Sequence, residues 1–253
     1  TSENVLFTAG SMEGLDLILR TFCEPNKDII CVPTPSFSAY EHWALLHNLQ
    51  VKKISLFGDN LDQLALEDII TINPKMIFIC DPNNPTGTKL KFETIQKLCS
   101  SLEGLVVVDE AYIEFSNQAS SIFYLNQYKN LIILRTFSKA WGLAGVRCGA
   151  IIAEKSIIHA LRYVQLPFAL SSLSQTAVKE QLLNPEPVFD SWKKIIEERE
   201  NLTHHLSSLK GITKIFKSET NFIMIVLEDF YRTLSLLNQY KIHVLDCSSS
   251  LMG

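Results

Sequence analysis

The sequence has no apolar run long enough to cross a membrane. Its longest apolar runs, at 77–80 and 104–108, have the length of strands, whereas a spanning helix needs about 20 residues. The opening residues, TSENVLFTAG, also lack a basic segment followed by an apolar one, so no secretory signal is predicted. We therefore expect no membrane partner and, by default, a cytoplasmic location.

Paired cysteines, clustered histidines and patches of a single charge are also missing. The six cysteines occur singly, without a CxxC pair, and are expected to be reduced core residues. The adjacent His204 and His205 fall on a predicted helix, where neighbours point in different directions, so no metal site is expected. The 23 basic and 27 acidic residues are spread along the chain, so nucleic acid is not an expected partner.

The sequence does contain a regular alternation of short apolar runs with longer amphipathic ones. Of its 253 residues, 47% are apolar, which is enough to bury a sizeable core. Helical patterns separate most of the expected strands, which lie at 28–33, 51–56, 75–81, 105–110, 131–136 and 148–153. This order predicts an α/β fold with a mostly parallel sheet and helices on both faces.

The pattern changes after about residue 170. A long charged helical stretch is followed by the segments 214–227 and 241–246, which are expected to contain strands of another layer. We therefore predict a large domain at 1–175 and a smaller α+β domain at 176–253.

Residues 135–149, RTFSKAWGLAGVRCG, follow a predicted strand and carry a first group of reactive side chains. Lys139 is placed to reach the crevice at the strand ends, where open α/β sheets bind ligands. Partial burial and a nearby cation would lower the pKa of this lysine and make it a nucleophile for an aldehyde. Thr136, Ser138 and Arg147 suit a phosphate group, because hydroxyls and a guanidinium donate hydrogen bonds to it. Taken singly, this stretch also fits an ordinary loop with a solvated lysine.

Further polar groups follow two other predicted strands. Asp109 ends the strand LVVVD, where a carboxylate is costly unless a cation meets it, and a protonated aromatic ring nitrogen is such a cation. Tyr112, and Asn84 in the segment NNPTG, are placed to hydrogen-bond an oxygen on the same ring. Taken singly, Asp109 also fits a helix cap, and NNPTG also fits an ordinary turn.

A strand, a glycine turn and an amphipathic helix are predicted near the start of the chain. The amides of Ser11 and Met12, directly after Gly10, would face an anion with the helix dipole behind them, which favours a phosphate. Phe37, in PTPSFSAY, is placed to stack on a flat ring. Singly, these features are also an ordinary helix start and a core aromatic.

Taken in the order in which they occur along the chain, these motifs resemble the fold-type I pyridoxal-phosphate enzymes of the aminotransferase class, over essentially the whole chain. Within that class, DEAYIEF at 109–115, the run that begins at Ser138, and SETNF at 218–222 most resemble the histidinol-phosphate aminotransferases. Pyridoxal 5′-phosphate is the implied cofactor, and the implied catalytic residues are Lys139, Asp109 and Tyr112. The implied cofactor-binding set is Gly10, Ser11, Met12, Phe37, Asn84, Asp109, Tyr112, Thr136, Ser138, Lys139 and Arg147.

The resemblance implies transfer of an amino group from an amino donor to a 2-oxo acid. For this subgroup the donor is histidinol phosphate and the acceptor is 2-oxoglutarate, which give imidazole acetol phosphate and glutamate in histidine biosynthesis. The same residues would serve an aminotransferase for another amino acid, or a decarboxylase of a phosphorylated amino acid. A homodimer is implied, because the active sites of this family form between two subunits.

The sequence departs from the family pattern in three places. The family carries a further segment before the glycine turn that would bind the phosphate. It also carries a C-terminal strand whose arginine binds the substrate carboxylate. We expect neither segment in this sequence. Leu245 stands where the family has an arginine that helps to hold the substrate phosphate. An inactive remnant of the fold is therefore another alternative, which the joint presence of Lys139, Asp109 and Arg147 opposes.

Overall fold

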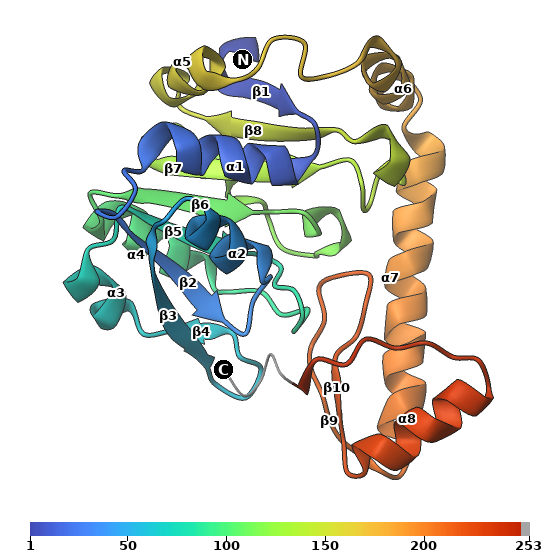
Figure 1. Ribbon diagram of the computed structural model, residues 1–253. Coiled ribbons are helices and arrows are strands. Elements are labelled where there is room, and N and C mark those ends of the chain that lie inside the picture. Colours follow the sequence, from blue (N-terminus) through green and yellow to red (C-terminus); the bar gives the residue numbers. More distant parts are fainter. Residues whose placement is uncertain (249–253) are drawn as a thin grey trace.

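The computed structural model describes residues 1–248 and is built around one sheet of eight strands (Figure 1). In the order of their pairing, the strands are β1 (Val5–Thr8), β8 (Gly149–Ala153), β7 (Leu131–Thr136), β6 (Leu105–Asp109), β5 (Met76–Cys80), β2 (Ile29–Thr34), β3 (Gln50–Phe57) and β4 (Gln63–Leu64). The strands β7, β6, β5, β2 and β3 are parallel to one another, whereas β8, β1 and β4 pair antiparallel with their neighbours. This arrangement confirms the predicted α/β fold.

Helices cover both faces of this sheet. One face packs against α1 (Ser11–Phe22), α2 (Ala39–Leu46) and α5 (Lys155–Val164), and the other against α3 (Leu66–Ile72) and α4 (Phe92–Ser101). Single 3-10 turns occur at Ser2–Asn4, Ile113–Phe115, Ser121–Tyr124 and Ala144–Val146. Among the described residues, no helix combines the length and the apolar character that crossing a membrane requires.

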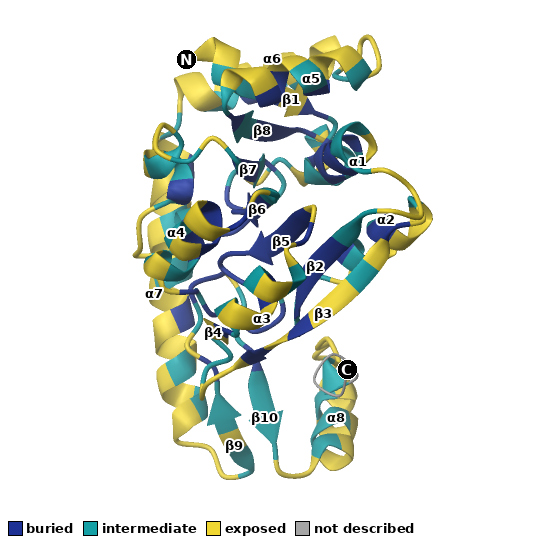
Figure 2. Ribbon diagram, turned by 90° about the vertical axis from the view of Figure 1, so that its left-hand side faces the viewer, coloured by how far each residue is buried: buried dark blue, intermediate teal, exposed yellow. Residues whose placement is uncertain are grey.

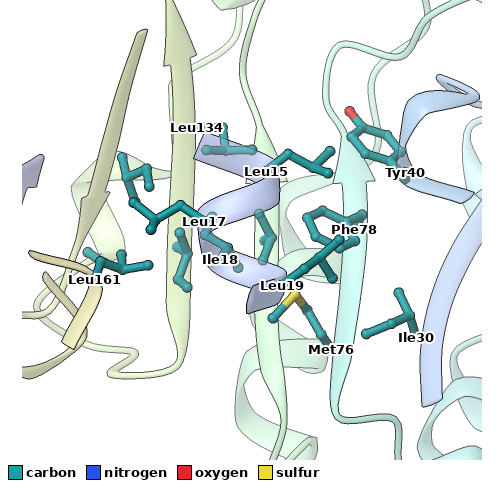
Figure 3. Close-up of a cluster of buried hydrophobic side chains, with 14 of the residues drawn as sticks. Leu15, Leu17, Ile18, Leu19, Ile30, Tyr40, Met76, Phe78, Leu134 and Leu161 are labelled. Atoms are coloured by element: carbon teal, nitrogen blue, oxygen red, sulfur yellow. The ribbon is translucent and has the colours of Figure 1, made fainter. Parts of the chain in front are cut away.

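Successive residues of a central strand face opposite helical layers. In β5, Met76 and Phe78 join the core cluster around α1, whereas Ile77 and Ile79 join the cluster around α4. Figure 3 shows side chains of α1 lying against Phe78 and Met76, and in Figure 2 the central strands are dark blue beneath partly exposed helices. Burial on both faces explains why these strands are continuously apolar in the sequence.

The chain after α5 leaves this sheet through two further helices. α6 (Ser172–Leu183) precedes α7 (Glu186–Ser207), which runs from the side of the sheet to a second, two-stranded antiparallel sheet (Figure 1). That sheet consists of β9 (Ile212–Ile215) and β10 (Ile225–Leu227), and α8 (Phe230–Gln239) follows it. The predicted domain boundary at residue 175 falls inside α6 and remains a proposal.

One expected strand, KIHVLD at 241–246, is not formed. Its residues have no strand structure, and all six are exposed. A strand needs a neighbour that exchanges backbone hydrogen bonds with it, and no strand of residues 1–248 pairs with this segment. The prediction was wrong because the apolar residues Ile242 and Val244 indicated a strand without showing whether a partner was available.

Replacing Leu19 by alanine is expected to lower the free energy of unfolding by about 2–5 kcal/mol, because the side chain is fully buried and its loss leaves a cavity. The matched control is Leu45→Ala on α2, where the leucine is 56% exposed and a change within about 0.5 kcal/mol is expected. Urea denaturation followed by circular dichroism measures both variants. Equal losses would contradict the placement of Leu19 in the core.

Candidate active site

The predicted site residues follow strands whose ends meet at one edge of the sheet. Cys80 at the end of β5 pairs with Asp109 at the end of β6, and Asp109 pairs with Leu134 of β7, two residues before that strand ends at Thr136. The loops after these three strands therefore start from the same edge of the sheet. Thr8 at the end of β1 and Thr136 at the end of β7 both pair with Gly149, the first residue of β8. The turn after β1 therefore reaches the same edge, where open α/β sheets bind their ligands.

Asp109 is a buried anion at this edge. The residue is only 5% exposed, and its carboxylate accepts hydrogen bonds from the Tyr40 hydroxyl (2.9 Å) and the Ala111 amide (3.1 Å). Burial raises the pKa of Asp109 to about 6, while these two hydrogen bonds and the charge of Lys139 oppose that rise. Two donors do not saturate a carboxylate, so acceptor positions are left for a cation.

Tyr112, Asn84 and Lys139 gather beside this carboxylate. The Asn84 side-chain nitrogen lies 3.5 Å from the Tyr112 hydroxyl, and Lys139 Nζ lies 5.6 Å from the centre of the Tyr112 ring. Burial raises the pKa of Tyr112 to about 12, so the hydroxyl keeps its proton at neutral pH and can donate it. Lys139 is exposed, which corrects the expected partial burial. The cause is its place in a turn beyond the end of β7 rather than in the core.

Arg147 lies against the glycine turn that follows β1. Its guanidinium donates hydrogen bonds to Ser138 Oγ (3.2 Å) and to the carbonyl oxygen of Ala144 (3.0 Å). Gly10 has a φ of +85°, and a Cβ at this position would lie 2.6 Å from Arg147 Nη2. Glycine therefore permits both the backbone conformation and the close approach of the cation.

The same turn opens helix α1 without a side-chain cap. Ser11 is the first residue of α1, and Gly10 before it offers no acceptor to the first amides. A Cβ at Gly149 would lie 2.6 Å from the Ser11 nitrogen, so β8 passes close behind the turn. Thr136 Oγ1 accepts from the Ser138 amide at 3.1 Å, which holds the adjoining loop. Met12 is half-buried in the first turn of the helix.

Phe37 lies half-buried in the loop after β2. Its ring meets the Tyr40 ring edge-on, with centroids 5.6 Å apart and planes at 87°. Phe37 therefore touches a residue that itself contacts Asp109. Its role as the aromatic that stacks on a cofactor ring stays a prediction.

Tyr40 is a site residue that sequence reasoning missed. It lies on the first turn of α2, three residues after Phe37 in PTPSFSAY, and it is fully buried. A hydroxyl-bearing aromatic among apolar core positions was the available signal, because a buried hydroxyl needs a partner. The sequence does not show that this partner is Asp109, 69 residues away.

The SETNF turn brings the C-terminal part of the chain to the same site. The Glu219 amide donates to the carbonyl oxygen of Gly87 (2.7 Å), and its carboxylate accepts from the Asn117 amide (3.0 Å). Arg199 of α7 is buried and donates to the carbonyl oxygens of Phe115 (3.1 Å) and Thr220 (2.8 Å). In the sequence, SETNF is singled out only by its resemblance to the family. These contacts show that it holds the loops after β5 and β6.

The chemistry of these donors fits the predicted cofactor, pyridoxal 5′-phosphate. Asp109 is a buried acceptor for a cationic ring nitrogen. The uncapped amides after Gly10, together with the Arg147 guanidinium, suit a phosphate group. Lys139 supplies an accessible amine beside Tyr112.

The chain is similar in sequence to enzymes of known activity. The family model for class I and II aminotransferases matches residues 1–252. The histidinol-phosphate aminotransferase of Flavobacterium johnsoniae is 38% identical over 228 residues, which cover 90% of this chain and 65% of that protein. The histidinol-phosphate aminotransferase of Cytophaga hutchinsonii is 33% identical over 253 residues, which cover 100% of this chain and 73% of that protein. The chain thus spans about two thirds of the length of these curated relatives.

A solved structure shows the same fold. The histidinol-phosphate aminotransferase from Clostridium acetobutylicum matches with a TM-score of 0.89 and 24% sequence identity, covering 98% of this chain and 75% of that one. The predicted type I fold of pyridoxal-phosphate enzymes is thereby confirmed. The family model and the relative from Cytophaga hutchinsonii confirm the resemblance inferred from the motifs: the chain belongs to the class I and II aminotransferases.

Proposed function

We propose that the chain forms the cofactor site of a pyridoxal-phosphate-dependent histidinol-phosphate aminotransferase. The observation that carries the proposal is the meeting of a buried carboxylate, an amine and a guanidinium at one sheet edge, in Asp109, Lys139 and Arg147. The activity of the curated relatives supports the choice of substrate. Amino acids and 2-oxo acids are accordingly the proposed partners.

Lys139 and Asp109 are proposed to have different roles in amino-group transfer. When bound, pyridoxal phosphate supplies an aldehyde that condenses with amines and an electron-poor ring that stabilises negative charge at the substrate α carbon. Lys139 would provide the amine that holds the cofactor and would move the proton of the substrate α carbon. Asp109 keeps a proton on the ring nitrogen, and its burial strengthens this attraction because little water screens it.

The remaining residues orient the cofactor. Tyr112 and Asn84 are proposed to hydrogen-bond the ring oxygen, since their polar atoms lie together beside Asp109. Arg147 and the amides after Gly10 are proposed to hold the phosphate, with Ser138 and Thr136 supporting that loop. A phosphate held there would keep the cofactor beside Lys139, as proton transfer requires.

The substrate is proposed from the relatives and not from contacts in the site. Leu245 is 82% exposed and offers no cation to a substrate phosphate. An aminotransferase for another amino acid and a decarboxylase of a phosphorylated amino acid remain the alternatives, because both would use Lys139 and Asp109 in the same way. A cytoplasmic location is likewise part of the proposal.

Replacing Lys139 by alanine is expected to abolish the visible absorption band that pyridoxal phosphate gives when it attaches to a protein amine. Lys129→Ala is the control, because this exposed lysine precedes β7 and lies at the opposite edge of the sheet, and its variant should keep the band. Histidinol phosphate and glutamate should bleach the band of the unaltered chain and release the corresponding keto products.

Three results would contradict parts of this proposal. A band that persists in Lys139→Ala would place the attachment elsewhere. Release of carbon dioxide in place of a keto product would favour the decarboxylase. An unaltered chain that gives no band with pyridoxal phosphate would favour the inactive remnant.

Replacing Arg147 by glutamine is expected to weaken the binding of pyridoxal phosphate at least about tenfold, the cost of losing a charged hydrogen bond. Binding of pyridoxal, which has no phosphate, should change little. Fluorescence titration measures both affinities, and Arg20→Gln on the exposed end of α1 is the control. An equal loss of affinity for both compounds would show that Arg147 does not bind the phosphate group.

The homodimer expected from the family is also part of our proposal. The segment 163–173, which spans the end of α5, the following loop and the start of α6, exposes Tyr163, Leu166, Phe168 and Leu173, and Phe168 is 100% exposed. Neighbouring apolar side chains of this kind favour contact with another protein surface. A second copy of the chain is the partner that we propose for this segment.

Replacing Phe168 by aspartate is expected to shift the chain from dimer to monomer, because burying a charge at an apolar interface is unfavourable. Sedimentation velocity at several protein concentrations measures the change. Phe123→Asp is the matched control, since this phenylalanine is 75% exposed but lies on the 3-10 turn Ser121–Tyr124, outside the segment. If the two variants sediment alike, the segment is not the interface.

A further inference from the structure

Tyr40 carries a polar group out of the core toward the site. Its ring is fully buried and stacks on Phe78, with centroids 5.3 Å apart and planes at 6°. In Figure 3 its hydroxyl oxygen points away from the cluster of apolar side chains. That oxygen lies 2.9 Å from Asp109 Oδ2.

The surroundings fix the direction of this hydrogen bond. Burial, with the nearby charge of Asp109, raises the pKa of Tyr40 well above its usual range, so the phenol keeps its proton and donates it. The Cys80 thiol of β5 also lies near the Tyr40 hydroxyl. Burial raises the pKa of this thiol, so it keeps its proton and donates to the Pro82 carbonyl oxygen at 3.3 Å. Asp109 is therefore the acceptor.

We propose that Tyr40 is a positioning residue, which holds the Asp109 carboxylate ionised and oriented toward the ring nitrogen of the cofactor. This inference rests on the proposed function. The Ala111 amide binds Oδ1 and the Tyr40 hydroxyl binds Oδ2, so the carboxylate is held at both oxygens. A donor on Oδ2 also lowers the affinity of the carboxylate for a proton. The proton between Asp109 and the ring is thereby kept on the nitrogen.

Tyr40 also links two predicted cofactor contacts. Its ring packs against the Phe37 ring in a T-shaped pair, and its hydroxyl donates to Asp109. Tyr40 thus contacts both Phe37 and Asp109, two of the residues that would hold the cofactor ring. The Tyr40 ring also stacks on Phe78, which is itself fully buried in β5, so the apolar part of the side chain lies within the core.

Tyr40→Phe tests the proposal, because it removes the hydroxyl and retains the ring that packs on Phe78 and Phe37. Pyridoxal phosphate labelled with nitrogen-15 in its ring is added to saturation, and the nitrogen resonance reports whether the ring is protonated. At neutral pH we expect the protonated signal from the unaltered chain and the unprotonated signal from Asp109→Asn. Tyr40→Phe should give a signal shifted from the first toward the second. An unshifted signal would overturn the inference.

Phe78→Leu is the matched control for packing. It disturbs the surface on which the Tyr40 ring stacks but leaves the hydroxyl in place, so its resonance should equal that of the unaltered chain. A shift as large as that of Tyr40→Phe would assign the effect to core packing and overturn the positioning role.

The double variant Tyr40→Phe with Asp109→Asn decides the question even where the single variant does not fold. It has no carboxylate at position 109 that needs a donor from Tyr40, and its affinity for pyridoxal phosphate should equal that of Asp109→Asn. A further loss of affinity would mean that Tyr40 acts by another route, and the inference would fail. An unaltered chain that binds no pyridoxal phosphate would instead reject the proposed function itself.

Discussion

A carboxylate that is removed from water needs donors or a cation, and the arrangement of this site follows from that need at Asp109. An unpaired buried charge costs several kcal/mol or shifts its pKa until it is neutral. Here, the Tyr40 hydroxyl and the Ala111 amide meet part of the need, and Lys139 contributes a nearby positive charge. The acceptor positions that remain explain why a ligand with a cationic ring suits this edge of the sheet.

The pairing of the strands places the other site residues at the same edge of the sheet as Asp109. Because Cys80 pairs with Asp109 and Asp109 with Leu134, the loops that follow β5, β6 and β7 leave the same edge of the sheet, with β7 extending two residues further to Thr136. The antiparallel pair of β1 and β8 brings a second group to the same edge, where Gly10 leaves space for Arg147. The anion that would bind the ring is thus the last residue of β6, and the cation that would bind the phosphate lies two residues before β8.

The sequence is informative where a property is local and uninformative where it depends on a distant partner. LVVVD and IFIC predict buried strands because burial on both faces demands continuous apolar residues, and both are formed. The contact of Tyr40 with Asp109 joins α2 to β6, and nothing in either segment specifies the other. The same limit explains the incorrect prediction for 241–246, since a strand is defined by its neighbour as much as by its own residues.

Residues of the C-terminal part of the chain hold the loops that follow β5, β6 and β7. Loops that follow strands are the mobile parts of an α/β fold, yet each of the three central loops is bound by at least one residue from outside the sheet. The Glu219 amide binds the Gly87 carbonyl oxygen after β5, Arg199 binds that of Phe115 after β6, and Trp192 Nε1 binds that of Ala140 after β7 at 2.6 Å. Because every one of these contacts ends on a backbone oxygen, the loops are fixed while the side chains of Asn84, Tyr112 and Lys139 remain available for the cofactor.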